Sequence, residues 1–236
     1  MRLLDRARVN DAIKALLAPY STDTNLDSLV AGRNIARLTV TEATATSDAV
    51  MEADLNLLRR YLLSFDAPAS GSAGRYLFDA WGAWPLMGDA RVNGQLVHGR
   101  RGDTDVVICG LDGALPTDAE RDLVSAAVRH INREPEGMSI AILKAAQQIY
   151  DVDLTITVPG VGPDPEVIVE EAIERVRKAA LARSLIGGQI PAGLLAGAAY
   201  GDNVLIVIDN APVVIEPDPY AVPVLGSLSV GYEVET

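Results

Sequence analysis

The sequence is poor in the residues that many catalytic and metal-binding sites use. Its 236 residues include one cysteine, Cys109, and two histidines, His98 and His130. A single cysteine excludes a disulfide bond within the chain. The two histidines lie far apart and lack both the H-E-x-x-H spacing and a cysteine partner, which argues against a zinc site. We therefore expect no metal and no cofactor.

Positive charge is also scarce. The chain has 20 Lys and Arg against 32 Asp and Glu, and its formal net charge is −12. Nucleic-acid binding depends chiefly on Lys and Arg neutralising phosphates, so this balance argues against a nucleic-acid partner. It favours a soluble protein that stays apart from others until a specific surface docks.

Long apolar runs are missing as well. No stretch approaches the ~20 apolar residues that cross a bilayer, so we expect no membrane partner. The first ten residues, MRLLDRARVN, are too charged for a secretory signal, and we expect synthesis in the cytoplasm. Aromatic residues are few, so aliphatic side chains and alanine must fill the core.

Small residues and proline crowd one stretch, FDAPASGSAGRYLFDAWG, at positions 65–82. A Walker loop requires a Lys-Ser or Lys-Thr after its last glycine, but Arg75 and Tyr76 follow Gly74 here. The stretch is also too short for a free tether. We interpret it as a hinge, in which Pro68 ends one helix and Gly71 and Gly74 let the backbone turn.

The first part of the chain has a helical pattern. Apolar side chains recur near helical spacing at residues 3–18, 25–32, 47–63 and 73–81, with a weak strand pattern at 35–41. The first helix has more leucine than it can bury alone, which suggests that it joins helices of partner chains, together with the helix at 47–63. The candidate interface residues there are Leu3, Leu4, Ile13, Leu16 and Leu17.

The second part has a mixed pattern. We predict a hairpin around Asn93 and Gly94, a central strand at 105–109, and a helix from 116 to about 131 with a Thr117–Glu120 capping box. Strands follow at 138–145 and 150–158, helices at 163–183 and 190–200, and strands at 203–209 and 213–216. The fold class is therefore α+β, with a mostly helical part at 1–84 and a mixed α/β layer part at 85–236.

In the C-terminal segment, apolar residues stand at even-numbered positions between 222 and 234. This pattern is typical of a strand, and Pro223 and Gly226 favour an edge strand or two short strands. We expect pairing with another copy by edge addition, with Val222, Val224 and Val230 as candidate contacts.

Several residues along the chain carry a resemblance to a known family. They are Met51-Glu52-Ala53-Asp54, Arg59-Arg60-Tyr61, Pro68, Ala73-Gly74, Tyr76, Ala80 and Gly88-Asp89-Ala90-Arg91-Val92, with Leu26-Asp27-Ser28-Leu29, Arg33 and Arg37-Leu38 upstream and Leu185-Ile186-Gly187-Gly188-Gln189-Ile190 and Asn210-Ala211-Pro212 downstream. This pattern resembles the baseplate J-like family of contractile phage tails.

The sequence departs from the family in three places. The usual "R-P-L-T-D-x-V-x-V" element is represented by Arg133 and Pro135 alone, and Gly88 stands where members have valine. Members also have a longer N-terminal portion, so contacts made by that portion would be absent here or come from another chain.

The resemblance implies a structural subunit of a baseplate wedge, in a phage tail or a tailocin, with no catalytic residues. Such subunits form wedges with other baseplate proteins and with a second copy of themselves, and the wedges join into a ring around the hub. The implied location is the virion tail, after assembly in the host cytoplasm. The alternatives are an enzyme, such as a hydrolase with an acidic site, and an unrelated soluble adaptor.

Overall fold

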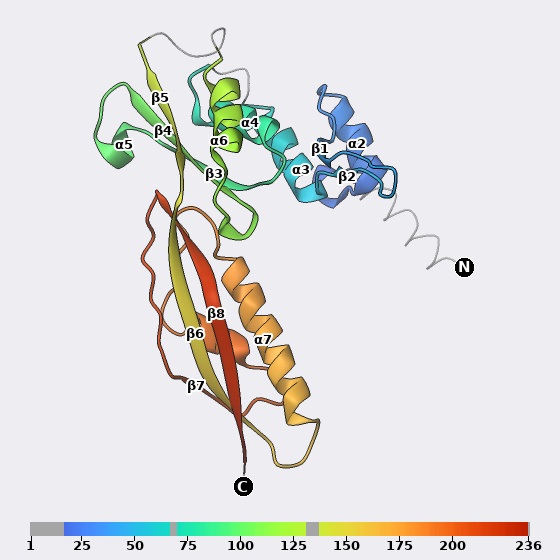
Figure 1. Ribbon diagram of the computed structural model, residues 1–236, viewed down its shortest axis with the longest axis vertical. Helices are drawn as coiled ribbons and strands as arrows, with labels where there is room; N and C mark the ends of the chain where they lie inside the picture. Colours follow the sequence, from blue (N-terminus) through green and yellow to red (C-terminus); the bar gives the residue numbers. More distant parts are fainter. Residues whose placement is uncertain (1–16, 67–69, 131–136, 236) are drawn as a thin grey trace. The chain divides into compact units, whose positions relative to one another are not determined.

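The computed structural model of the chain describes residues 17–66, 70–130 and 137–235, and its elements are drawn in Figure 1. The chain divides into two compact units. The first comprises Met1–Val106 and Thr117–Ile142, and the second comprises Val107–Pro116 and Leu143–Thr236. The chain passes between the units three times: within strand β4 (Asp103–Gly110), after Pro116, and within strand β5 (Ser139–Lys144).

Helices dominate the beginning of the first unit. A short 3-10 turn, η1 (Ala18–Tyr20), precedes α2 (Asp23–Ala31), and two short antiparallel strands follow, β1 (Thr39–Thr41) and β2 (Val50–Met51). Then come α3 (Asp54–Leu63) and α4 (Ala73–Ala83). The core that joins α2 to α3 consists of Leu26, Val30, Ile35 and Leu57.

The predicted helix at 47–63 begins later than expected. Ser47 and Asp48 do not cap it, because α3 starts at Asp54 with Ala53 at its N-cap. The residues before it form β2, which pairs with β1, and Glu52 turns into the protein interior. Pairing with β1 therefore overrides the helical pattern of the preceding residues.

The rest of the first unit is a three-stranded sheet in the order β3–β4–β5, with β3 at Met87–Asn93. Strand β4 is central, and its apolar run is buried, as predicted. Helix α6 (Asp118–Val128) packs against α4 and begins with the predicted capping box: Thr117 Oγ1 accepts from the Glu120 N–H, and Glu120 Oε2 accepts from the Thr117 N–H.

The predicted hairpin at Asn93 and Gly94 is wrong. A short helix, α5 (Gln95–His98), stands between β3 and β4 and ends at Gly99, which has a φ of 77°. Gly94 has extended backbone angles, whereas a two-residue type I′ turn requires positive φ at both central residues. Leu96, on α5, lies fully in solvent.

The second unit contains a three-stranded sheet in the order β7–β6–β8. Its long strands β6 (Ala146–Val158) and β8 (Ala221–Val234) run parallel, and the short β7 (Ile206–Asp209) is antiparallel to β6. Figure 1 shows α7 (Pro165–Leu181) running along these strands. A short turn, η2 (Leu111–Gly113), and a short helix, α8 (Leu194–Ala199), complete the unit.

The main core of the second unit lies between the sheet and its two helices. Alternate residues of β6, the ones that shared a parity in the sequence, are buried against α7 and α8. The cluster consists of Tyr150, Val152, Leu154, Val176, Ala180, Ile190, Leu195 and Ala199. The α+β class predicted from the sequence is confirmed by this arrangement and by the first unit.

Two predicted elements near α8 differ from the structure. Ile190 forms an isolated bridge with Ile215 instead of starting a helix, and α8 begins only after Gly193, which has a φ of 74°. The predicted strand at 213–216 is reduced to that same bridge. Pairing with a distant segment thus replaces local structure at both places.

Strand β8 is one continuous edge strand, but its even-numbered residues do not share a face. Tyr150 of β6 pairs with Leu225, whereas Val152 pairs with Leu228, so two residues of β8, Gly226 and Ser227, face the single Asp151. This is a β-bulge, and an extra residue reverses the side to which later side chains point.

The bulge sends β8 into two cores. Before it, Val222 and Val224 pack with Val107 and Cys109 in a cluster that also contains Ala145 and Ile186. After it, Leu228 and Val230 pack beneath α7. The apolar residues at even-numbered positions of β8 therefore pack on both faces of the sheet.

Candidate functional site: interaction surfaces

The most specific part of the family-like sequence forms a buried ion pair. Glu52 lies between β2 and α3, and its Oε2 is 2.7 Å from Nη1 of Arg60 on α3. The exposed fractions of the two side chains are 1% and 8%. Glu52 Oε2 also accepts from the Leu38 N–H, and the Arg60 guanidinium donates to the Ala36 carbonyl. The pair thus joins the segment before β1 to α3.

A second arginine gathers the neighbouring carboxylates. Arg37 donates to Asp27 on α2 at 2.9 Å and to Asp54 at the start of α3 at 2.6 Å. It also donates to the Glu52 carbonyl oxygen at 2.6 Å. The "E-x-D" pattern at 52–54 and its upstream arginine therefore hold α2, the β1–β2 pair and α3 together.

The electrostatics of this network stabilise its charged forms. The Asp23 N–H and the Arg37 guanidinium hold the pKa of Asp54 below its ordinary value, despite partial burial. For Arg37, burial alone would lower the pKa, but hydrogen bonds and charges from Asp27 and Asp54 raise it above the ordinary value. Asp23 has a φ of 50°, so Asp54 accepts from a backbone held in an uncommon conformation.

Two further arginines tie α3 to its surroundings. Arg33 donates to Ser64 at the end of α3 and lies 4.1 Å above the ring of Phe65. Arg59 lies 4.5 Å above the ring of Trp81 on α4 and donates to the Gly88 carbonyl. The arginines of the family-like pattern thus act as structural contacts.

The predicted hinge lies between α3 and α4, inside the first unit. Pro68 falls outside the described residues. Gly71 has a φ of 77°, which suits glycine, and Ser72 caps α4 by accepting from the Arg75 N–H. A Cβ on Gly74 would lie 2.5 Å from Cβ of Asp66, so this glycine permits a close approach of the loop to α4.

Most of the predicted N-terminal interface lies outside the described residues, namely Leu3, Leu4, Ile13 and Leu16. Leu17 is described and half exposed. Leu55 and Leu62 are not among the candidate interface residues, but they lie on the second helix that we expect to join partner chains. They stand seven residues apart on α3 and are 67% and 56% exposed. A spacing of seven places both on one face of a helix.

The predicted C-terminal contacts lie largely inside their own unit. Val222 is fully buried, and Val224 and Val230 are partly buried against the two cores. Their side chains therefore stabilise the second unit. The backbone at the outer edge of β8 is the part of this segment that an incoming strand could contact.

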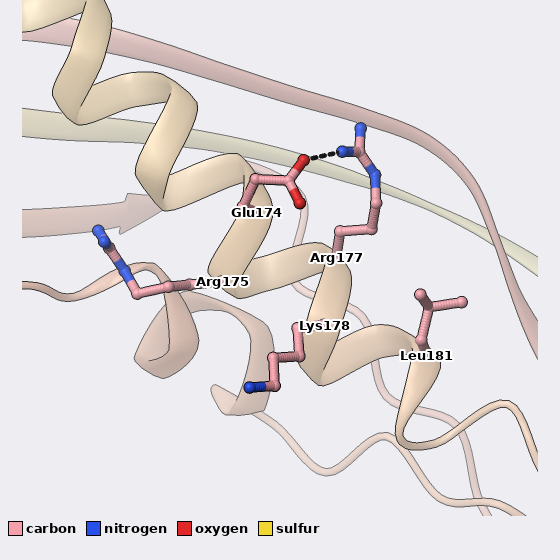
Figure 2. Close-up of a pocket in the computed structure, with 5 residues that line it drawn as sticks. All are labelled: Glu174, Arg175, Arg177, Lys178 and Leu181. Carbon is pink, nitrogen blue, oxygen red and sulfur yellow. Dashed lines mark hydrogen bonds and ion pairs between the residues drawn. The ribbon is translucent and has the colours of Figure 1, made fainter. Parts of the chain in front are cut away.

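Charged side chains border an open groove along α7. Figure 2 shows the residues that line it: Glu174, Arg175, Arg177, Lys178 and Leu181. Glu174 and Arg177 form an ion pair on one side of the helix. Arg175 points to the other side, where it donates to the Ala199 carbonyl of α8.

Within the described residues, no group of three or more His, Cys, Asp and Glu side chains is placed to hold a metal ion. His98 and His130 lie on separate segments, and Cys109 is buried in the core. None of the helices in the described ranges is long and apolar enough to cross a bilayer.

Comparison with known proteins gives the chain's similarities. The family model described as "Baseplate J-like N-terminal domain" matches residues 1–44. The resemblance predicted from the sequence is thereby confirmed.

One relative matches most of the chain. Over 219 residues the protein is 26% identical to baseplate protein J of Escherichia phage P2, a match that covers 89% of this chain and 70% of that protein. The similarity supports a structural role in a phage baseplate and a location in the tail of the virion.

Proposed function

We propose that the protein is a structural subunit of the baseplate wedge of a contractile tail, in a phage or a tailocin. It forms wedges with other baseplate proteins and with a second copy of itself, and the wedges join into a ring around the hub. The observation that carries this proposal is the similarity to a phage baseplate protein over 89% of the chain, a length that includes residues of both compact units.

The first unit is proposed to provide the bundle surface of the wedge. Leu55 and Leu62 form an exposed apolar stripe on α3, and Leu17 precedes the same group of helices. Exposed leucines at helical spacing can pack against a helix of another chain. The partners are proteins, because the net charge of −12 disfavours a nucleic-acid surface.

Mutation of the stripe tests this role. We expect Leu55→Glu with Leu62→Glu to prevent wedge formation when the chain is co-expressed with the baseplate proteins of neighbouring genes. Leu96→Glu on α5 is the matched control, since that leucine is also exposed in the same unit. Size-exclusion chromatography and negative-stain images give the readout. Normal wedges with the double variant would remove α3 from the interface.

The same images test the function itself. Ring- or wedge-shaped particles that contain the wild-type chain are expected. If the chain never enters particles formed by its neighbours, the baseplate role is wrong, whatever the behaviour of α3.

The role is proposed to be mechanical, without catalysis. Three carboxylates of the first unit, Asp27, Glu52 and Asp54, are bound by Arg37 and Arg60. The pKa of Asp54 is lowered, which disfavours its use as a general acid. A hydrolase assay on cell-wall and ester substrates that showed turnover would contradict this.

The segment from Pro68 to Gly74 is proposed to let one sequence adopt two arrangements in a wedge. The movement would take place between α3 and α4 and would have to break the contact of Arg59 with Trp81. Comparison of the copies within one ring is the test. Identical backbone angles in the loop and identical packing of α3 on α4 in all copies would exclude a hinge.

A further inference from the structure

The outer edge of β8 has no partner strand among the described residues. β8 pairs with β6 on one side only and stands last in the sheet order. It is 14 residues long, and Glu233 is its only charged residue. Proteins usually protect a long edge strand with charges, proline or a bulge, because its free backbone groups are a template for another strand. β8 has Pro223 and the bulge at Gly226 and Ser227, so the part after the bulge is the least protected.

A groove lies between this strand and the C-terminal half of α7. It has a volume of about 350 Å³ and is lined by β8 residues 224–226 and 228, by Arg177 and Leu181 of α7, and by Asp112 and Ser184. The C-terminal half of α7 therefore borders the start of β8. Since β6 and β8 are parallel and α7 connects back between them, α7 runs in the opposite direction along the strand.

The charges of α7 are separated along its length. The N-terminal half carries Glu166, Glu170, Glu171 and Glu174, and the C-terminal half carries Arg175, Arg177 and Lys178. Glu174 and Arg177 lie on the side of the helix away from Arg175 (Figure 2), and Arg177 lines the groove at β8. The pair of Glu174 with Arg177 is exposed, so exchanging it for an intermolecular pair costs little.

We propose that the partner at this edge is a second copy of the chain, paired antiparallel through β8 about a two-fold axis. A two-fold contact uses the same surface on both copies and therefore requires self-complementarity. Antiparallel β8 strands bring the acidic half of one α7 toward the basic half of the other. In β8 itself, only a register centred on Glu233 would oppose like charges. This inference rests on the proposed multi-copy assembly and specifies how two copies meet.

Charge exchange in the full-length chain tests the proposal. One variant combines Arg177→Glu with Lys178→Glu, and the other combines Glu166→Lys, Glu170→Lys and Glu174→Lys. In either variant alone, both halves of α7 carry the same sign, so self-association should weaken by roughly tenfold or more, the effect of losing charge pairs across an interface. Mixing the two variants should restore dimers, because each then supplies the sign that the other lacks.

The readouts are sedimentation velocity across a range of concentrations and hydrogen exchange of the peptide at 224–234. We expect the wild type to dimerise and the exchange of that peptide to slow as dimers form. A wild type that stays monomeric at all concentrations overturns the proposal. So does a dimer without protection of β8, or mixed variants that fail to associate. If a different baseplate protein protects β8 instead, the edge binds that protein and not a second copy. The proposal of a second copy is then wrong, whereas the proposed wedge function is retained.

Discussion

The buried pair of Glu52 and Arg60 gives the sharpest test of how the first unit is held together. Glu52→Ala removes the carboxylate that neutralises Arg60 and that accepts from the Leu38 N–H. The guanidinium keeps only its hydrogen bond to the Ala36 carbonyl, and Nε of Arg60 has no hydrogen-bond partner even in the wild type. The substitution therefore leaves a buried charge with little compensation.

The expected cost follows from that burial. Breaking a buried ion pair by removing one partner costs about 3–5 kcal/mol, because the remaining charge stays desolvated. An unsatisfied backbone N–H at Leu38 adds to this, but the two effects share one network and do not sum. Since a domain is stable by about 5–15 kcal/mol, the variant loses a large share of the free energy of unfolding.

Tryptophan fluorescence during denaturant unfolding measures this loss. The only two tryptophans, Trp81 and Trp84, are buried in the first unit, so the signal reports that unit even if the second unfolds separately. Arg121→Ala is the control for an exposed pair and should change the stability little.

Two outcomes would refute the reasoning. If Glu52→Ala costs no more than Arg121→Ala, the pair does not carry the stability inferred for it. The double variant Glu52→Leu with Arg60→Met keeps the volume and removes both charges, and it should recover most of the loss. A double variant as unstable as Glu52→Ala would show that the loss does not come from the stranded charge.

Other parts of the chain give further predictions. Gly226→Ala should cost about 1–3 kcal/mol in the melting of the second unit, because its Cβ would lie 2.8 Å from Oδ1 of Asp151. Gly231→Ala on the same strand is the control, since its nearest atom is 4.0 Å away. The pKa of Asp54 is lowered, so its stabilisation is complete above the unfolded value of about 3.9 and is lost as the pH falls through the folded value. The tryptophan-monitored stability should therefore fall below about pH 4, and less steeply in Asp54→Asn. Thr117→Ala removes the cap of α6 and should cost about 0.5–2 kcal/mol in the same assay.

The sequence correctly predicts those elements that are determined by interactions between residues close in the chain. The capping box of α6, the alternation of β6 and the apolar run of β4 each act within a few residues, and the structure confirms all three. The errors fall where distant pairing decides. The residues at 50–51 pair with β1 instead of continuing a helix, and Ile190 pairs with Ile215 instead of starting one. No periodicity within either segment contains that information.

The sequence pattern marks the motif residues but does not show their role. Sequence identified Glu52, Asp54 and Arg60 as a family-like pattern, but spacing alone does not show whether carboxylates near arginines form a binding site or a structural network. The structure decides this by burial and partners: Glu52 faces Arg60 in the interior, and Asp54 meets Arg37 and the backbone of Asp23. A pattern of this kind stabilises the first unit.

The C-terminal strand shows how one bulge changes the functional interpretation of a sequence. Its apolar residues at even-numbered positions suggested one strand that pairs with another copy, with Val222 and Val230 among the candidate contacts. The extra residue opposite Asp151 instead sends the two valines to different faces, where both pack inside their own unit. Ser227 fixes the bulge by donating its N–H and hydroxyl to Asp151, whose pKa is lowered by these hydrogen bonds, the one from the hydroxyl first. With the apolar side chains used internally, the edge retains its backbone groups and the adjacent charges of α7. Any association through β8 must therefore be directional, set by strand polarity and charge rather than by an apolar patch.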